Sequence, residues 1–137
     1  MKMKRIIHIE GDRNTRERVR RVLGDIVEVT SVPDSLSAID EYIKPYRTRP
    51  RVVIVSNDPL KSPTNTDPRC REGLHFVYAI RTGSTGDEDQ PVVLYTKDVK
   101  GIGLDIFRRY NIKPEDAIKK GDENGLRAAI ERYLVQA

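Results

Sequence analysis

Several polar residues that could bind phosphate or a metal ion follow short apolar runs of the sequence. Glu10 and Asp12 come after "KRIIHI", Thr96 closes "PVVLYT", and Lys120 ends "DAIKK". Carboxylates bind divalent cations, whereas a hydroxyl and an ammonium group bind anionic oxygens. If the apolar runs are neighbouring strands, these side chains form one polar site.

The run "RVVIVSND" (residues 51–58) ends in three polar residues, and its exact end decides the chemistry. With four apolar residues in the strand, Ser56 follows it, whereas a strand counted from Val53 is followed by Asn57. Neither residue is a carboxylate. Asp58 lies two residues beyond Ser56, about 6–7 Å along a strand, and would need a bulge or an altered turn to take its place.

Strand and helix patterns alternate along the chain. This alternation predicts an α/β fold, a single doubly wound five-stranded parallel sheet of flavodoxin-like (βα)5 type, in one domain covering residues 1–137. Continuous apolar strands agree with a sheet buried on both faces, and functional groups of such sheets gather at the carboxyl ends of the strands. The strands are predicted at 4–9, 26–30, 51–56, 91–96 and 116–120.

The helices between the strands are predicted from apolar stripes. We expect Ile39 and Ile43 on the stripe of the second helix, and Leu104, Phe107 and Ile112 near the inner side of the fourth. The first helix is expected to turn its arginines to water, namely Arg16, Arg18, Arg20 and Arg21.

The composition indicates a soluble chain of 137 residues with 34% charged residues and a net charge of +4. No apolar run approaches the roughly 20 residues of a membrane span. The single cysteine, Cys70, fits a loop thiol in a reducing cytoplasm, where we expect the protein. No aromatic residues interleave with the arginines of the first helix, which argues against nucleic acid as a partner.

The order of these segments resembles that of the receiver domains of two-component response regulators, over nearly the whole chain. The similar segments are "RIIHIEGDRNTRERVRRVLGD", "RPRVVIVS", "EGLHFVYAIR", "PVVLYTKD" and "EDAIKKGD". In that family an Asp after the third strand accepts a phosphoryl group from a kinase histidine. Magnesium is held by this Asp and by two acids after the first strand, while a hydroxyl and a lysine bind the phosphoryl oxygens.

The resemblance implies an incomplete magnesium site. Glu10 matches the first acid, but Gly11 stands where the second belongs, and Asp12 matches a third acidic position found in many members. We therefore expect weak magnesium binding at most, through Glu10 and Asp12, and no other cofactor.

The phosphoryl-binding positions are kept, but the switch positions are not. Thr96 matches the hydroxyl and Lys120 the lysine, with Lys119 as the neighbouring alternative. Ala117 stands where an aromatic switch residue is usual, and Gly121 stands where a proline normally follows the lysine. The acceptor position falls on Ser56 or Asn57.

The resemblance therefore indicates a pseudo-receiver, a signalling module of a phosphorelay that acts through protein contacts without phosphorylation and is not an enzyme. A histidine kinase or a downstream effector is the expected partner, and the fourth helix, fifth strand and fifth helix are the expected surface for partners or a homodimer. Two alternatives remain: a magnesium-dependent receiver that is phosphorylated on Asp58, and a small flavodoxin-like nucleotide or flavin binder. The second lacks a Gly-rich phosphate loop.

Without an acceptor carboxylate, Lys120 would face Glu10 and Asp12, and we expect an ion pair or a water-bridged cluster there. His8 lies between Ile7 and Ile9 in the first strand. It is interpreted as a packed, hydrogen-bonded histidine and not as a metal ligand or phosphohistidine.

Overall fold

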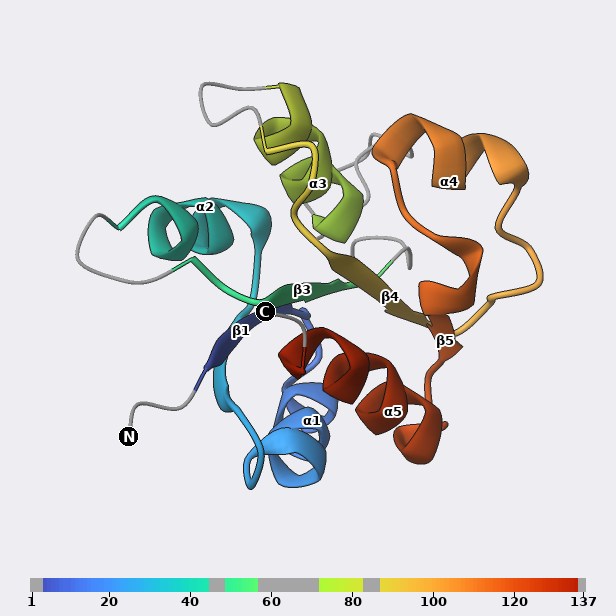
Figure 1. Ribbon diagram of the computed structural model, residues 1–137. Coiled ribbons are helices and arrows are strands. Elements are labelled where there is room, and N and C mark those ends of the chain that lie inside the picture. Colours follow the sequence, from blue (N-terminus) through green and yellow to red (C-terminus); the bar gives the residue numbers. More distant parts are fainter. Residues whose placement is uncertain (1–3, 45–48, 57–71, 83–86, 136–137) are drawn as a thin grey trace.

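The computed structural model describes residues 4–44, 49–56, 72–82 and 87–135. In these residues five strands form one parallel sheet in the order β2-β1-β3-β4-β5 (Figure 1). The predicted five-stranded α/β fold is thereby confirmed. The strands are β1 (Arg5–Ile9), β2 (Glu28–Val32), β3 (Val52–Val55), β4 (Val92–Thr96) and β5 (Ala117–Lys119).

Helices cover both faces of the sheet (Figure 1). One face carries α1 and α5, and the other carries α2, α3 and α4. The direction of winding reverses between β1 and β3, so the carboxyl ends of these strands lie at the switch point of the sheet. The helices are α1 (Arg13–Leu23), α2 (Ser35–Ile43), α3 (Glu72–Thr82), α4 (Leu104–Tyr110), the 3-10 helix η1 (Pro114–Asp116) and α5 (Glu123–Leu134).

Aspartates begin three of the helices. Asp12 accepts a hydrogen bond from the amide of Thr15, Asp34 from that of Ser37, and Asp122 from that of Gly125. Each bond satisfies an amide that the first turn of a helix would otherwise leave unpaired. The caps of α1 and α5 follow β1 and β5, and both helices therefore begin at the carboxyl edge of the sheet.

The core has two layers, one on each face of the sheet. Alternation along β1 sends Ile6 towards α1 and α5, and Ile7 and Ile9 towards α2, α3 and α4. The central strands β1, β3 and β4 are buried at every position, as expected for strands covered on both faces. The polar side chains that follow them are therefore fixed by well-packed strands.

The second strand lies two residues later than predicted, at 28–32 instead of 26–30. The amides of Ile26 and Val27 both donate to the carbonyl of Leu23, at 3.0 and 3.1 Å. These β-branched residues therefore belong to the turn that closes α1, and they pack against the core from there.

Two apolar residues predicted to face inward are exposed. Leu104 is 66% exposed, because the inner stripe of α4 is formed by Ile106, Phe107 and Tyr110, and Leu104 lies on another side of the helix. Ile43, the last residue of α2, is 56% exposed.

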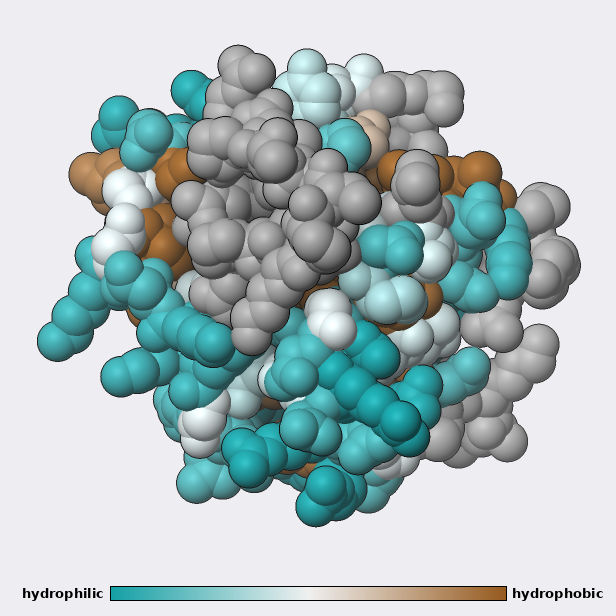
Figure 2. All heavy atoms as spheres, turned by 180° about the vertical axis from the view of Figure 1, so that it is seen from behind, coloured by the Kyte–Doolittle hydropathy of each residue, from teal (hydrophilic) through white to brown (hydrophobic). Residues whose placement is uncertain are grey.

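The remaining surface agrees with the polar composition. Hydrophilic side chains cover most of the lower half of the molecule seen from behind, at the level where α1 and α5 lie (Figure 2). Within the described part of the chain, we find no helix with the length and apolar character needed to cross a membrane. The predictions for Asn57, Asp58 and Cys70 lie outside the described residues.

Candidate functional site

Four of the predicted site residues lie at the carboxyl edge of the sheet. Glu10 follows β1, Ser56 follows β3, Thr96 ends β4 and Lys120 follows β5. All four strands are neighbours in the sheet, so the topology brings these residues to one place. Glu10, Ser56 and Thr96 are buried, with 7%, 8% and 1% of their surface exposed.

An ion pair crosses this edge. The Lys120 Nζ atom lies 2.8 Å from Glu10 Oε2, and the two side chains are only 14% and 8% exposed. Since β3 and β4 separate β1 from β5, the Lys120 side chain reaches Glu10 across the ends of the strands that carry Ser56 and Thr96. The predicted ion pair between Lys120 and Glu10 is thus present in the structure.

Backbone contacts fix the position of Lys120. Its amide donates to the Thr96 carbonyl at 2.9 Å, and the next amide, of Gly121, donates to the Tyr95 hydroxyl at 3.0 Å. Gly121 has a φ of 101°, which disfavours any residue with a Cβ atom. Glycine at this position therefore suits the turn that directs Lys120 over the edge. Lys119, the alternative, is exposed at the end of β5.

Asp12, which was expected beside Lys120, caps α1. Its Oδ2 atom accepts from the amide of Thr15 at 3.2 Å and from the Thr15 hydroxyl at 2.7 Å. The demand for a cap at the start of α1 thus engages this carboxylate. Glu10 Oε1 in turn accepts from the Asp12 amide at 3.1 Å, which closes the turn between β1 and α1.

The residues at this turn do not fit the magnesium ion that the resemblance implies. Gly11 offers no carboxylate, Glu10 is engaged by Lys120 and by the turn, and Asp12 caps α1. Among the residues that can be placed, no three His, Cys, Asp or Glu side chains are grouped as metal ligands would be. Magnesium in proteins rests on carboxylates completed by waters, and both carboxylates of this turn already accept from donors of the protein.

The end of β3 places Ser56 directly after the strand. The strand spans Val52–Val55, and its pairing with β1 places Ile54 opposite His8. Continued by two residues, the same register sets Ser56 beside Glu10. Asn57 and Asp58 lie beyond the described segment 49–56.

His8 lies beneath this edge, on the same face of β1 as Glu10. Burial, with Lys120, Arg16 and Arg20 nearby, lowers its pKa from 6.5 to about 3. The imidazole is therefore neutral and 1% exposed, as expected for a packed histidine. The expected hydrogen bond is not found at Nδ1, which is buried without a partner among the described residues.

Arg16 was expected to face water, but it contacts the turn instead. Its Nη1 atom donates to the carbonyls of Glu10 and Gly11, at 2.7 and 3.1 Å. No signal in the sequence distinguishes Arg16 from the neighbouring arginines. Helical periodicity predicts the side of α1 on which a residue lies, but not the backbone carbonyls that its side chain will contact.

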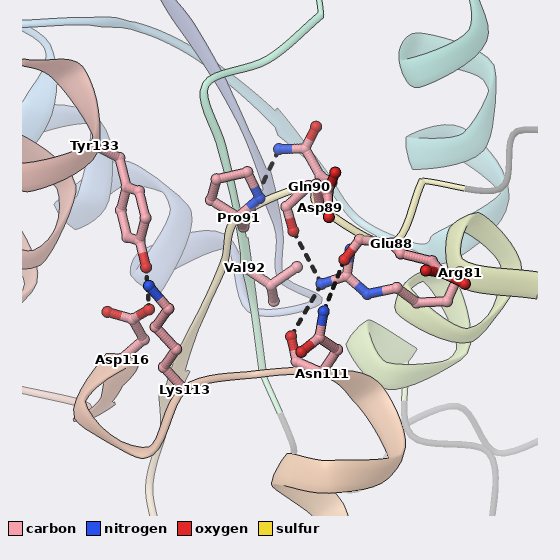
Figure 3. A pocket seen from close by; sticks show the side chains of 10 residues that line it. All are labelled: Arg81, Glu88, Asp89, Gln90, Pro91, Val92, Asn111, Lys113, Asp116 and Tyr133. Atoms are coloured by element: carbon pink, nitrogen blue, oxygen red, sulfur yellow. Dashed lines mark hydrogen bonds between the residues drawn. The ribbon is translucent and has the colours of Figure 1, made fainter. Parts of the chain in front are cut away.

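Two shallow hollows, of about 250 and 290 Å³, adjoin at the opposite edge of the sheet, where β4 begins. Side chains of both charges line the first, including Arg81, Lys113 and Glu88 (Figure 3). The buried carboxylate of Asp116 accepts from the hydroxyl of Tyr133 and from Arg132. Burial and the Asp116 carboxylate raise the pKa of Tyr133.

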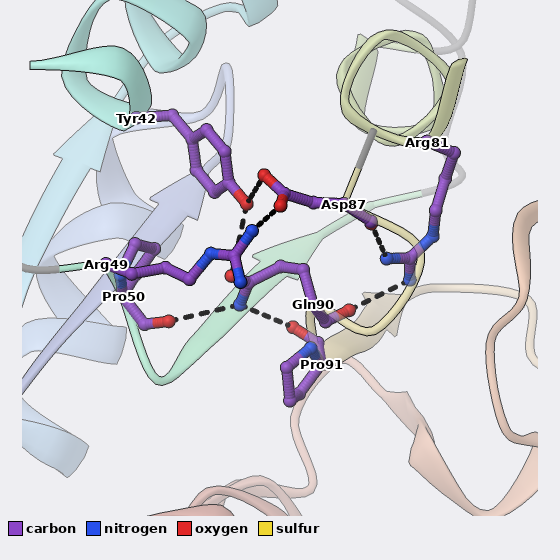
Figure 4. Close-up of polar contacts among 7 residues, drawn as sticks. All are labelled: Tyr42, Arg49, Pro50, Arg81, Asp87, Gln90 and Pro91. Carbon is purple, nitrogen blue, oxygen red and sulfur yellow. Dashed lines mark hydrogen bonds and ion pairs between the residues drawn. The ribbon is translucent and has the colours of Figure 1, made fainter. Parts of the chain in front are cut away.

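The side chains around these hollows form a polar network within the protein (Figure 4). Arg81 donates to the carbonyls of Asp87 and Gln90, at 2.6 and 2.9 Å, and Asp87 accepts from Tyr42 and pairs with Arg49. The side-chain Nε2 of Gln90 donates to the carbonyls of Pro50 and Pro91. The network ties loops together, and we assign it a structural role.

Comparison with known proteins supports the fold. No family model and no curated protein matches the chain. The bacteriophytochrome response regulator AtBRR is 20% identical, with a TM-score of 0.69 over 100% of this chain and 96% of that chain.

Two Vibrio structures are similar in the same way. The chemotaxis response regulator CheY4 of Vibrio cholerae is 18% identical, with a TM-score of 0.71 over 96% of this chain and 98% of that chain. The receiver domain of a putative LuxO repressor from Vibrio parahaemolyticus is 14% identical, with a TM-score of 0.69 over 98% and 91%. The chain therefore has the fold of response regulator receiver domains.

Proposed function

We propose that this protein is a pseudo-receiver, a signalling module that acts through protein contacts in the cytoplasm without being phosphorylated. The observation that carries the proposal is Ser56, which directly follows β3 at the edge where Lys120 pairs with Glu10. A neutral hydroxyl in that position cannot take over the phosphoryl group of a phosphohistidine without a base to activate it.

The surroundings of Ser56 support the same conclusion. In the phosphorylated receivers that the fold resembles, the lysine binds the phosphoryl oxygens, whereas Lys120 here is paired with a buried carboxylate. Ala117, in β5, stands at the place of the aromatic switch residue and packs against the core. The site therefore holds one arrangement that needs no phosphoryl group.

We propose α4, β5 and α5 as the contact surface for a histidine kinase, an effector or a second copy of the chain. Leu104 and the charged Arg108 and Arg109 are exposed on α4, and Arg132 is exposed on α5. This exposed leucine with arginines around it would complement a partner surface that has an apolar centre and acidic residues at its rim.

The experiment is a titration with magnesium and beryllofluoride, a phosphoryl mimic, followed by amide chemical shifts. In the wild-type protein we expect the amides of Thr96, Lys120 and Gly121 to stay unchanged. Shifts at these amides that disappear in Asp58→Ala would establish the alternative, a receiver that uses Asp58. Shifts caused by a flavin or a nucleotide but not by beryllofluoride would favour the ligand-binding alternative.

A further inference from the structure

The turn between β1 and α1, which carries Glu10 and Asp12, is contacted by the guanidinium of Arg16. Arg16 lies in the first half of α1, and its guanidinium turns back to the carbonyls of Glu10 and Gly11, at 2.7 and 3.1 Å. The side chain is partly buried, whereas Arg18 and Arg20 of the same helix are exposed. Arg16 is thus a built part of the turn.

Three of the four carboxylate oxygens of Glu10 and Asp12 are engaged by donors of the protein. Glu10 Oε2 pairs with Lys120, Glu10 Oε1 accepts the Asp12 amide, and Asp12 Oδ2 accepts from Thr15. A divalent ion would have to displace these contacts and also lie close to the guanidinium of Arg16. Both changes oppose binding, because like charges repel strongly where side chains are partly buried.

We infer that Arg16 takes the place of the divalent cation, so that this chain holds its site in order without a metal ion. Arg16 brings its positive charge to the carbonyls of the turn from the side of α1, and Lys120 pairs with the Glu10 carboxylate from the side of β5. The inference builds on the proposed function, since both concern the same edge of the sheet. It has its own test, because magnesium binding and phosphoryl acceptance are measured separately.

The first measurement is a magnesium chloride titration of the wild-type protein, without beryllofluoride, followed by amide shifts and thermal unfolding. We expect unchanged amides for residues 10–16 and an unchanged midpoint of unfolding. Saturable shifts confined to these residues would overturn the inference, even if the protein accepted no phosphoryl group.

The second measurement restores the missing carboxylates in Gly11→Asp/Ser56→Asp. We expect magnesium to bind this variant weakly, and to bind at least about tenfold more tightly when Arg16→Met is added, because a nearby positive charge is removed. Arg18→Met is the matched control, since it removes an exposed arginine of the same helix and should change the affinity little. Equal magnesium affinity with Arg16→Met and Arg18→Met would contradict the inference.

Discussion

Glu10 and Lys120 are a buried pair of charges, and each depends on the other. Removing Lys120 leaves the Glu10 carboxylate, only 8% exposed, without the ammonium group that it pairs with. The loss of such a partner costs far more than the loss of a surface ion pair. This pair is therefore the part of the edge where a single substitution has the largest effect on stability.

We predict that Lys120→Met lowers the free energy of unfolding by about 3–5 kcal/mol, because Glu10 stays buried without its partner. Lys119→Met, at an exposed position, should change it by less than about 0.5 kcal/mol. Urea unfolding of both variants measures the difference. Equal effects would show that the ion pair contributes no more than a surface charge.

His8 predicts a pH dependence of stability. The folded protein holds its pKa at about 3, whereas the unfolded chain has the ordinary value of 6.5. Below the ordinary value only the unfolded chain takes up the proton, so stability is lost as the pH falls. From about pH 7 to pH 5 this loss amounts to about 2 kcal/mol.

Urea unfolding at the two pH values, for wild type and His8→Leu, isolates this contribution from that of the carboxylates. The variant should lose less stability than the wild type between the two pH values, whereas His75→Leu, at an exposed position of α3, should behave like the wild type. An identical loss in His8→Leu would mean that His8 is not the group responsible.

The sequence was sufficient to predict those site residues whose position depends only on where a strand ends. Glu10, Thr96 and Lys120 were predicted together because parallel strands bring their carboxyl ends to one edge. The role of Arg16 could not be predicted, since it depends on where a long side chain turns after the helix has packed. The same holds for Asp12, whose carboxylate caps α1.

At the scale of elements, α4 is the helix that is held least by apolar packing. None of its residues is fully buried, and its inner stripe of Ile106, Phe107 and Tyr110 is only partly covered. Its end is held by Arg81, which donates to the carbonyls of Tyr110 and Asn111, at 3.1 and 3.2 Å.

We predict that Arg81→Leu frees the end of α4. Four carbonyls of neighbouring segments lose their donor, which should destabilise the fold by about 1–3 kcal/mol. The amide of Ile112, which bonds to the carbonyl of Phe107, should exchange with deuterium faster than in the wild type. Arg109→Leu, at an exposed position of α4, is the control, and equal exchange in both variants would contradict the role of Arg81.

The kinds and order of the elements were predictable because each strand is a short β-branched run and each helix has an apolar stripe. The limits of β2 were not, since Ile26 and Val27 suit a strand as well as the turn that they occupy. Leu104 was wrongly predicted to face inward for a related reason. The short helix α4 has apolar residues on two sides, and packing against the neighbouring α3 determines which side is buried.

At the scale of the whole molecule, the parallel sheet positions both the polar residues at its carboxyl edge and the helices around it. Central strands buried at every position fix the edge that carries Ser56, Thr96 and the ion pair. We propose α4, β5 and α5, at one side of the sheet, for contacts with other proteins. The chain thus has the fold of a receiver, and the proposal that its chemistry differs depends on Gly11 and Ser56 at this edge.

The most direct test is the intact mass of the protein after incubation with magnesium and a small phosphodonor such as acetyl phosphate. We predict that the wild-type mass stays unchanged, and that Gly11→Asp/Ser56→Asp, with Arg16→Met added, gains one phosphoryl group. A stoichiometric gain in the wild-type protein, lost in Asp58→Ala, would contradict the account.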